Sequence, residues 1–519
     1  MVDFGALLDA RASKSPDGIY LVCDGREWSF AHVKHRVDQC AAGLARIGIR
    51  NQDRVAMLVG NCAEFLFLWW GMWRLGAVMV PINLRLTARE IAYIVNHSEA
   101  GAVVMGAECA GLLPGLEKEC PGVKHWLGIG LPASGRTRPV EAFFDTRGAV
   151  SAPRRADPEA PASILYTSGT TGFPKGVVHS QGNYLRTGAA FSTSTRLVTG
   201  DRLLTANPLF HVNAQFYSAL GTLHSGATFI LMNKFSASGM WEWTRQFRAN
   251  KVVLLLALAT ILYQREPRAD DADNPVEVVV AGGVPKGCYR DFERRFGVRL
   301  QTLYSLSESP LAVLGMPDEA CVDGAVGRPM LTAGEEPNLV KVFDDKDREL
   351  PAGVAGEIVI RNAALMKEYY KSPQETANAL RGGWLHTGDR GVTDENGLLH
   401  FLGRIKDVIR KKGENISAAE VEAVLAAHPG VAEAAVVGVA APDAAGEEEI
   451  LACIVWRKGV IQGFEALARH CAASLADFKV PRFWQTWEEF PKNQMNRVVK
   501  AGLKKETAGA GPVYDQRRK

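Results

Sequence analysis

The sequence has no apolar run long enough to cross a lipid bilayer. Its most hydrophobic stretch, residues 65–80, is interrupted by Arg74 and two glycines, and Pro81 ends it before the ~20 residues that a spanning helix needs. The residues after Met1 include acidic side chains and no long apolar segment, unlike a secretory signal. We therefore expect a buried helix followed by a short strand at 65–80, and a cytoplasmic protein without a transmembrane segment.

Closely spaced cysteines are also missing. The nine cysteines are scattered, with no C-x-x-C pair and no group of His and Cys at zinc spacing, so we expect reduced, mostly buried thiols. Charge of one sign is equally scarce, because 60 basic and 57 acidic residues leave a net charge of +3. The composition thus gives no reason to expect a nucleic-acid partner or binding to an anionic membrane.

Up to about residue 300 the sequence alternates helical and strand patterns. Helical patterns at 30–44, 63–75 and 87–98 alternate with strand-like runs at 54–59, 77–80 and 102–105. A similar rhythm recurs between about 180 and 300, where residues 276–281 form a buried strand pattern. Such alternation predicts two parallel-type sheets covered by helices, and hence an α/β fold.

The pattern changes beyond about residue 330. Runs at 338–343 and 356–361 predict paired strands, and a turn at 394–397 predicts a hairpin, which together indicate a small β subdomain. A charged, glycine-punctuated segment begins at Gly403. After it, helical and strand patterns follow one another at 418–427, 434–439, 450–456 and 463–474. We place a domain boundary near Gly403 and expect a small α/β domain after it.

A glycine- and hydroxyl-rich segment follows the strand pattern at 162–166. It reads Tyr166-Thr-Ser-Gly-Thr-Thr-Gly-Phe-Pro-Lys-Gly176. Glycines let backbone N–H groups turn toward an anion, the hydroxyls add donors, and the lysine adds a point charge. A flexible surface loop would explain the glycines but not the hydroxyls and lysine together. The spacing also differs from that of a Walker loop. We predict a cradle for ATP phosphates made by Thr167, Ser168, Gly169, Thr170, Thr171, Gly172 and Lys175.

This segment resembles the phosphate-binding signature of the adenylate-forming (ANL) superfamily, which includes acyl-CoA synthetases, adenylation domains of peptide synthetases and beetle luciferases. Further motifs extend the resemblance over nearly the whole chain in the expected order. It implies a large N-terminal adenylation (AMP-binding) domain at 1–402, a hinge at 403–407 and a small mobile C-terminal domain at 408–519. It also implies the use of ATP, Mg²⁺ and CoA.

The segment Asn207-Pro-Leu-Phe-His-Val-Asn-Ala-Gln215 is similar to the family's second signature, whose histidine lies beside the carboxylate substrate. The resemblance implies that His211 shields and orients that carboxylate. Without the resemblance, a lone histidine among apolar residues would more often be a buried core residue. The acyl pocket implied by this register contains His211, Asn213, Gln215, Tyr217 and Gly283.

Two motifs resemble the family's adenine and metal site. The first is Ala281-Gly-Gly-Val-Pro285, and the second is Tyr304-Ser-Leu-Ser-Glu308, where the family usually has tyrosine-glycine-leucine-threonine-glutamate. The resemblance implies that Tyr304 covers the purine face and that Glu308 holds Mg²⁺ through oxygen ligation. The remaining residues implied at this site are Gly282, Gly283, Val284 and Ser305 beside the adenine and Ser307 at the phosphate.

Later motifs supply the ribose site and the hinge. The resemblance implies that Asp389 accepts hydrogen bonds from the ribose hydroxyls and that Arg404 closes on the sugar or on phosphate. A turn residue and a solvated linker charge are the alternatives for these two. Lys406 occupies the hinge position, and Gly413 and Glu414 lie in the loop that meets the pantetheine arm of CoA. For the basic run at 410–412, a solvated face and a CoA contact both remain open.

The last motif departs from the family pattern. The family has proline-x-threonine-x-threonine-glycine-lysine, whereas this chain has Arg497 at the lysine position after Pro491 and Asn496 in place of glycine. Arginine is cationic and its fork can bind carboxylate and phosphate oxygens. Three hypotheses follow: Arg497 replaces the lysine, Lys500 replaces it, or adenylation is impaired.

The resemblance implies a carboxylate–CoA ligase that forms an acyl-adenylate and then an acyl-CoA. The alternatives are an enzyme that loads a carrier protein and a nucleotide-binding homologue without activity. The polar residues predicted around the acyl group favour a short, aromatic or polar acid over palmitate, because buried unpaired amides cost ~1–3 kcal/mol each. The pattern looks most like the carnitine/crotonobetaine–CoA ligase branch. Expected partners are a small carboxylate, ATP and CoA, and a homodimer is compatible with the sequence.

Overall fold

The computed structural model describes most of the chain, in two compact units. The described residues are 3–144, 157–167, 174–254, 258–282, 284, 287–332, 334, 336–411, 414–440, 448–459, 463–492, 498–504 and 513–516. The large unit comprises Met1–Val340 and Ile360–His386, and the small unit comprises Lys341–Val359 and Thr387–Lys519. This division reflects only how compactly the residues pack. The predicted domain boundary at 402/403 and the rotation about a hinge therefore remain predictions.

One sheet of the large unit is built on six parallel strands. In order across the sheet, β1, β11, β10, β12, β13 and β14 run parallel, while β2 at one edge and β15 and β16 at the other are antiparallel. The strands are β1 (Ile19–Cys23), β2 (Arg26–Ser29), β10 (Arg202–Thr205), β11 (Thr228–Leu231), β12 (Lys251–Leu254), β13 (Val278–Ala281), β14 (Arg299–Tyr304), β15 (Val313–Leu314) and β16 (Ala325–Pro329).

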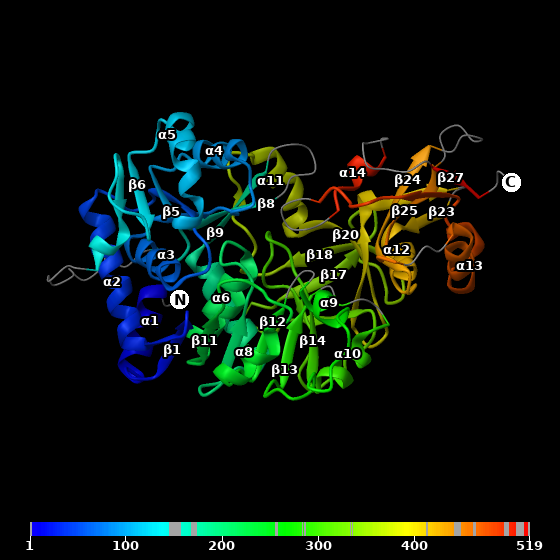
Figure 1. The fold of residues 1–519 in the computed structure, drawn as a ribbon, viewed down its shortest axis with the longest axis horizontal. Helices are drawn as coiled ribbons and strands as arrows, with labels where there is room; N and C mark the ends of the chain where they lie inside the picture. Colours follow the sequence, from blue (N-terminus) through cyan, green and yellow to red (C-terminus); the bar gives the residue numbers. More distant parts are fainter. Residues whose placement is uncertain are drawn as a thin grey trace. The chain divides into compact units, whose positions relative to one another are not determined.

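A second sheet of the large unit has the order β19-β9-β8-β4-β3-β5-β6-β7. The strands from β8 to β7 are parallel, and β9 and β19 extend the sheet antiparallel (Figure 1). The strands are β3 (Arg54–Leu58), β4 (Val78–Pro81), β5 (Ala102–Gly106), β6 (His125–Ile129), β7 (Thr137–Pro139), β8 (Pro161–Thr167), β9 (Lys175–Ser180) and β19 (Glu368–Tyr369). Two parallel-type sheets confirm the predicted fold class.

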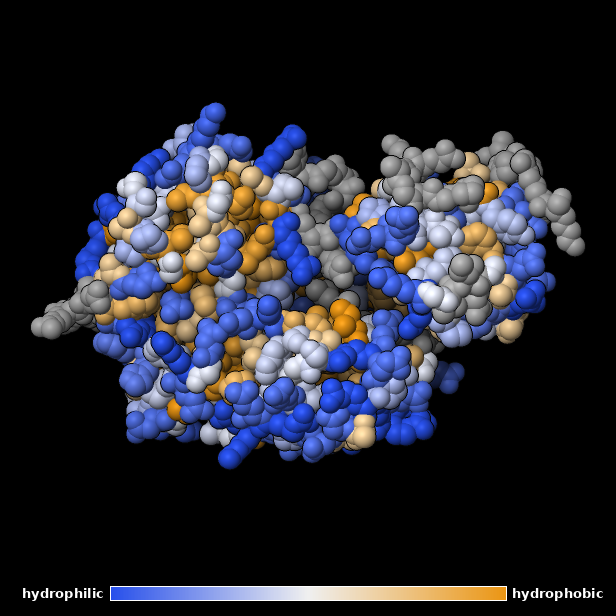
Figure 2. Space-filling view, in the orientation of Figure 1, coloured by the Kyte–Doolittle hydropathy of each residue, from blue (hydrophilic) through white to orange (hydrophobic). Residues whose placement is uncertain are grey.

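Helices cover these sheets. They are α1 (Phe4–Lys14), α2 (Phe30–Arg46), α3 (Ala63–Leu75), α4 (Ala88–His97), α5 (Leu113–Glu119), α6 (Gln181–Ser194), the π-helix η3 (Ala214–Ala219), α7 (Leu220–Ser225), α8 (Met240–Phe247), α9 (Leu258–Tyr263), α10 (Tyr289–Phe296) and α11 (Pro373–Ala379), with short 3-10 turns η1 (Ala107–Leu112), η2 (Val140–Phe143) and η4 (Arg381–Gly383). Helix α10 buries Tyr289, Phe292 and Phe296 and turns its charged side chains outward. Figure 2 shows the resulting hydrophilic surface around α8 and α10.

The longest apolar stretch forms α3 and β4, as predicted. Trp69, Trp70 and Trp73 are fully buried, and Phe4 packs its ring 5.0 Å from Trp70 and 5.2 Å from Trp73. Arg74, also buried, pairs with Asp9 and with Asp38 at 3.3 Å, which explains how a charge is tolerated here. Among the residues that the structure describes, no helix is both long and apolar enough to span a membrane.

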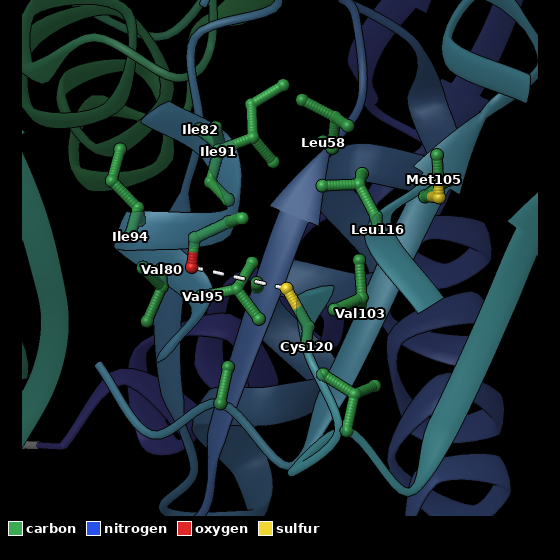
Figure 3. Close-up of a cluster of buried hydrophobic side chains, with 14 of the residues drawn as sticks. Leu58, Val80, Ile82, Ile91, Ile94, Val95, Val103, Met105, Leu116 and Cys120 are labelled. Carbon is green, nitrogen blue, oxygen red and sulfur yellow. Dashed lines mark hydrogen bonds between the residues drawn. The ribbon is translucent and has the colours of Figure 1, made fainter. Parts of the chain in front are cut away.

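The core of the second sheet depends on α4. A capping box begins this helix, because the Thr87 hydroxyl and the Glu90 carboxylate each bond the other's backbone N–H. The helix directs Ile91, Ile94 and Val95 into one buried cluster with Val80 of β4 (Figure 3). This core fixes the strands that lead to the candidate site.

The small unit contains further sheets. Strands β17 (Leu339–Phe343), β18 (Gly356–Arg361), β20 (Leu385–Thr393) and β21 (Leu399–Arg404) neighbour one another in that order, β22 (Val408–Lys411) pairs with β23 (Glu414–Ser417), and a third sheet has the order β24 (Val431–Ala440), β25 (Glu448–Trp456), β26 (Phe483–Thr486) and β27 (Tyr514–Asp515). The helices are η5 (Ile405–Asp407), α12 (Ala418–Ala426), α13 (Phe464–Ser474), η6 (Asp477–Lys479) and α14 (Lys500–Leu503). Strand β25 pairs in parallel with β26, which agrees with the predicted α/β class of the C-terminal part, while the predicted bounds 408–519 stay a prediction.

Candidate active site

An antiparallel hairpin of β8 and β9 frames the predicted phosphate loop. Thr167, the last residue of β8, is paired across the ladder with Lys175, the first residue of β9. The predicted loop residues Ser168, Gly169, Thr170, Thr171 and Gly172 lie outside the described residues. The hairpin therefore fixes both ends of the loop, and its contacts with phosphate remain a prediction.

Lys175 lies between a carboxylate and an aromatic ring. Its Nζ is 2.8 Å from Oε1 of Glu375 in α11 and 5.2 Å from the centroid of the Tyr369 ring. Its side chain is 29% exposed. An ammonium held at a strand end, with a partner that is itself in contact with water, can exchange that partner for a phosphate.

Tyr369 also contacts Glu308, the predicted metal ligand. The Tyr369 hydroxyl donates a hydrogen bond to Glu308 Oε1 at 2.8 Å, and the backbone N–H of Met366 donates to the Glu308 carbonyl at 2.8 Å. Glu308 and Lys175 are thus joined through Tyr369. Sequence reasoning missed Tyr369 and Glu375, because the pair of tyrosines at 369–370 indicates a strand without indicating its partners.

A third missed residue is His179 of β9. It is fully buried, and its Nε2 is 2.7 Å from the carbonyl oxygen of Ser307, while its Nδ1 is 3.0 Å from Nδ2 of Asn183. Since a carbonyl only accepts, Nε2 carries the proton and Nδ1 accepts. Burial lowers the pKa of His179 to about 4, so the ring is neutral and holds the backbone beside Glu308.

The predicted adenine residues meet at one edge of the first sheet. Gly282 follows β13 and Tyr304 ends β14, and these neighbouring strands are parallel, with Ala281 opposite Thr302. Carboxyl ends of parallel strands are the usual place for a ligand in such sheets. Tyr304 and Val284 are buried, Ser305 and Ser307 are half-buried, and Gly283 lies outside the described residues. The structure brings these residues together, and their role toward adenine remains a prediction.

The predicted acyl residues lie at the start of the π-helix η3. His211 and Asn213 are half-buried and precede the helix, while Gln215 and Tyr217 are fully buried within it. A π-helical turn is rare and often occurs at functional sites. All four residues therefore belong to one unusual segment.

The polar groups of Gln215 and Tyr217 have partners inside the protein. Gln215 Nε2 donates to the Leu209 carbonyl at 2.6 Å, and Gln215 Oε1 accepts from Tyr184 at 2.6 Å. The Tyr217 hydroxyl donates to the Pro310 carbonyl at 2.5 Å. Since these groups are satisfied, the argument for a polar acyl pocket depends mainly on His211 and Asn213.

In the small unit, Asp389 and Arg404 face each other across the β20–β21 ladder. Arg404 Nε is 2.8 Å from Asp389 Oδ1. The Asp389 side chain is 4% exposed and lies in a strand, which distinguishes it from a surface turn residue. The structure thus brings the predicted ribose pair together, while binding of ribose remains a prediction.

The predicted hinge and CoA loop are only partly described. Lys406 lies in the short turn η5 and Glu414 begins β23, but their side chains, like Gly413, lie outside the described part of the chain. In the basic run, Lys411 is buried and its Nζ is 2.8 Å from Glu449 Oε2. Lys411 is therefore part of a buried ion pair and not of a solvated face.

Arg497 also lies outside the described residues, but the residues on either side of its segment are described. Lys492 and Val498 form an antiparallel bridge, and the Val499 N–H donates to the Pro491 carbonyl at 2.7 Å. We refer to Pro491, Lys492, Val498 and Val499 as the C-terminal bridge. Residues 493–497 lie between its two sides in the sequence.

Lys500, the alternative to Arg497, is held within the small unit. Its Nζ is 2.7 Å from Glu422 Oε1 and 3.9 Å from Asp407 Oδ2. Glu422 Oε1 also accepts the backbone N–H of Val436 at 2.7 Å. Burial raises the pKa of Glu422, and the nearby Lys500 opposes that change. This geometry favours Arg497 over Lys500 as the cation that acts on substrate.

Comparison with protein families gives two matches along the chain. The profile of the AMP-binding enzyme family matches residues 8–370, and that of the AMP-binding enzyme C-terminal domain matches residues 420–496. The two profiles together confirm the resemblance predicted from the motifs.

Individual proteins are similar over nearly the whole chain. A crotonobetaine/carnitine–CoA ligase of Salmonella heidelberg (strain SL476) is 33% identical over 501 residues, covering 94% of this chain and 95% of that protein. ATP-bound MatB from Rhodopseudomonas palustris has a TM-score of 0.87 at 26% identity, covering 97% of this chain and 98% of the other. The o-succinylbenzoate CoA synthetase MenE from Bacillus subtilis, bound to its acyl-adenylate intermediate, has a TM-score of 0.84 at 25% identity, covering 98% and 100%.

Proposed function

The chain belongs to the AMP-binding enzyme family, and from this we propose that it is an AMP-forming carboxylate–CoA ligase, an acid–thiol ligase. It would activate a carboxylic acid with MgATP to an acyl-adenylate and then transfer the acyl group to CoA, releasing AMP. The observation that carries the proposal is the match of both family profiles to a chain in which Tyr369 joins Lys175 to Glu308.

In the first step, positioning and charge neutralisation supply most of the catalysis. Lys175 would leave Glu375 and bind the phosphates of ATP. Arg497 would bind the attacking carboxylate and the α-phosphate together, and His211 would orient that carboxylate. The step breaks the bond between the α- and β-phosphates and releases pyrophosphate.

Glu308 fits a Mg²⁺ site. Its Oε1 accepts from Tyr369, while its Oε2 has no hydrogen-bonding or ionic partner among the described residues. Carboxylate oxygen is the ligand that Mg²⁺ prefers. Bound there, Mg²⁺ would neutralise charge on the phosphates.

In the second step, residues of the small unit would bind the ribose and the pantetheine arm of CoA. Asp389 and Arg404 would hold the ribose, and the segment around Lys406 would act as the hinge of a domain rotation. Gly413 and Glu414 would then meet the pantetheine arm, so that the CoA thiol attacks the acyl carbonyl. Domain rotation lets one site serve two reactions in turn.

Two alternatives are separated by simple assays. ATP–pyrophosphate exchange that depends on a carboxylate would exclude an inactive nucleotide-binding homologue. AMP release that depends on CoA would exclude an enzyme that loads only a carrier protein. The names of the relatives, all CoA ligases or synthetases except the ATP-bound MatB, support CoA as the acceptor.

For the acyl group we propose a short, polar or aromatic acid. The 33% identity with a crotonobetaine/carnitine–CoA ligase supports this class, and so do the half-buried His211 and Asn213. A panel of carboxylates from short polar acids to palmitate, assayed for CoA-dependent AMP formation, tests it. We expect crotonobetaine, carnitine or another short acid to give the highest kcat/KM, and a preference for palmitate would overturn the proposal.

A cytoplasmic location, expected from the sequence, stays a prediction, and so does a homodimer. Cell fractionation would test the location. Light scattering on the purified protein would test the oligomeric state.

A further inference from the structure

Tyr369 contacts both of the charged groups that are predicted to act on ATP. Its hydroxyl donates to Glu308 Oε1 at 2.8 Å, and its ring lies 5.2 Å from the Lys175 ammonium. All three residues belong to the large unit. They come from three separate segments: the turn after β14, the strand β9 and the short strand β19.

We propose that Tyr369 is a positioning residue for adenylation, whose hydroxyl fixes the Glu308 carboxylate so that its second oxygen is presented to the divalent cation of MgATP. This inference rests on the proposed function. The Tyr369 ring also provides the surface that the Lys175 ammonium contacts before it binds the phosphates.

The backbone around Tyr369 is held on both sides. Tyr369 pairs with Val177 of β9, its N–H donates to Thr376 Oγ1 at 2.9 Å, and its carbonyl accepts the Ser372 N–H at 3.0 Å. The next residue donates its N–H to the Gly176 carbonyl at 2.7 Å. Tyr369 is therefore anchored to the same strand that begins with Lys175, so the two side chains keep their spacing.

The adjacent tyrosine reaches a different partner. Side chains of consecutive strand residues point to opposite faces. The Tyr370 hydroxyl accordingly donates to Glu99 Oε2 at 3.2 Å, and Glu99 also pairs with Lys371 at 2.9 Å. Tyr370 thus offers a matched control: it has the same side chain, directly follows β19, and bonds Glu99 where Tyr369 bonds Glu308.

The chemistry explains why a phenol is useful here. A carboxylate with both oxygens free rotates about its terminal bond, and a hydrogen bond from a neutral hydroxyl restricts that rotation without adding charge. An amino group in the same place would neutralise Glu308 and weaken its attraction for a cation. The Tyr369 hydroxyl orients Glu308 and leaves its charge intact.

The test compares Tyr369→Phe with Tyr370→Phe in the full-length protein. Both keep the aromatic ring, so Tyr369→Phe retains the surface against which Lys175 lies. Two quantities are measured: binding of Mn²⁺ in the presence of α,β-methylene-ATP, by electron paramagnetic resonance, and the Mg²⁺ concentration that gives half-maximal ATP–pyrophosphate exchange. Melting temperatures confirm that both variants fold.

We expect Tyr369→Phe to weaken Mn²⁺ binding and to raise the half-maximal Mg²⁺ concentration about 3- to 10-fold, because the hydroxyl acts on the cation through the orientation of Glu308 and not by direct contact. Tyr370→Phe should change either quantity less than twofold. In a Glu308→Gln background, Tyr369→Phe should add less than a further twofold to the loss of exchange, because its partner is already altered.

Unchanged Mn²⁺ binding in Tyr369→Phe would overturn the inference. An equal loss in Tyr370→Phe would also overturn it, because the effect would then belong to the strand and not to the Glu308 contact. If wild-type protein shows no ATP–pyrophosphate exchange with any carboxylate, the proposed function fails, while the Mn²⁺ measurement still decides the role of Tyr369.

Discussion

Two lysines of this protein each pair with a glutamate, and their surroundings differ. Lys175 of the large unit is 2.8 Å from Glu375, whose side chain is 44% exposed. Lys500 of the small unit is 2.7 Å from Glu422, whose side chain is 23% exposed and also accepts a backbone N–H. The second pair is bonded to the backbone of β24 and the first pair is more exposed, so we expect the first to open toward a ligand more readily. An ion pair alone therefore does not identify a catalytic lysine, and the exposure and other bonds of its partner help to rank the candidates.

The largest expected effect is at position 497. Arg497→Ala should lower ATP–pyrophosphate exchange about 100-fold or more, because a charge that acts on the transition state is lost. Arg497→Lys should retain part of the activity, and Lys500→Met should stay within about fivefold of wild type, since a partly exposed ion pair contributes only about 0.2–1 kcal/mol. If exchange activity is lost in Lys500→Met and kept in Arg497→Ala, then Lys500 is the cation that acts on the substrate.

Lys175→Met should lower kcat/KM for ATP about 10- to 100-fold, because the ammonium neutralises phosphate charge in a preorganised position. The measurement is steady-state kinetics with ATP as the varied substrate. Lys367→Met is the matched control. Lys367 directly precedes β19 in the sequence, and it pairs with Glu159 at 2.6 Å. Equal losses in the two variants would show that Lys175 acts through folding alone.

His179 gives the large unit a pH dependence. Its pKa in the folded protein is about 4, below the ordinary value of 6.5, so the unfolded chain binds the proton more readily. This residue's contribution to stability is complete above pH 6.5 and is lost as the pH falls toward 4, by about 2 kcal/mol at pH 5.

We therefore expect the melting temperature of wild-type protein to fall more between pH 7 and pH 5 than that of His179→Asn. The variant will be less stable at pH 7, so the measured quantity is the difference between the two pH values for each protein. An equal fall in both would contradict the buried, neutral imidazole.

The smallest expected effect is at Glu375. Glu375→Gln should lower KM for ATP about twofold, because Lys175 no longer has to leave an exposed ion pair that contributes about 0.2–1 kcal/mol. The exposed Glu368 provides the control, and Glu368→Gln should leave KM unchanged. An increase in KM would mean that Glu375 holds Lys175 in place for ATP instead of competing with it.

Sequence patterns predicted most of the fold. The helix expected at 63–75 is α3 with the same bounds, and the strands expected at 54–59 and 102–105 are β3 and β5. These elements follow from local periodicity, which a single sequence contains. The fold class and the family could also be predicted, because the motifs that indicate them are short and contiguous. Both predictions were confirmed.

The contacts of the candidate site could not be predicted in the same way. Tyr369 meets Glu308 across 61 positions of sequence, through the pairing of the two-residue strand β19 with β9. Such pairing leaves no periodic signal. The sequence also did not reveal that the Gln215 amide is bonded to Leu209 and Tyr184, and its place in the acyl pocket stays a prediction. Hydrogen bonds of a buried amide depend on tertiary neighbours, which local pattern does not reveal.

The C-terminal bridge has a consequence for protein engineering. Its bonds use Pro491, Lys492, Val498 and Val499, and Lys492 also pairs with Glu433 at 2.8 Å. These bonds use none of the side chains at positions 493–497. We therefore expect substitutions at those positions, Arg497 included, to leave the bridge in place and to change the rate of the reaction without unfolding the small unit.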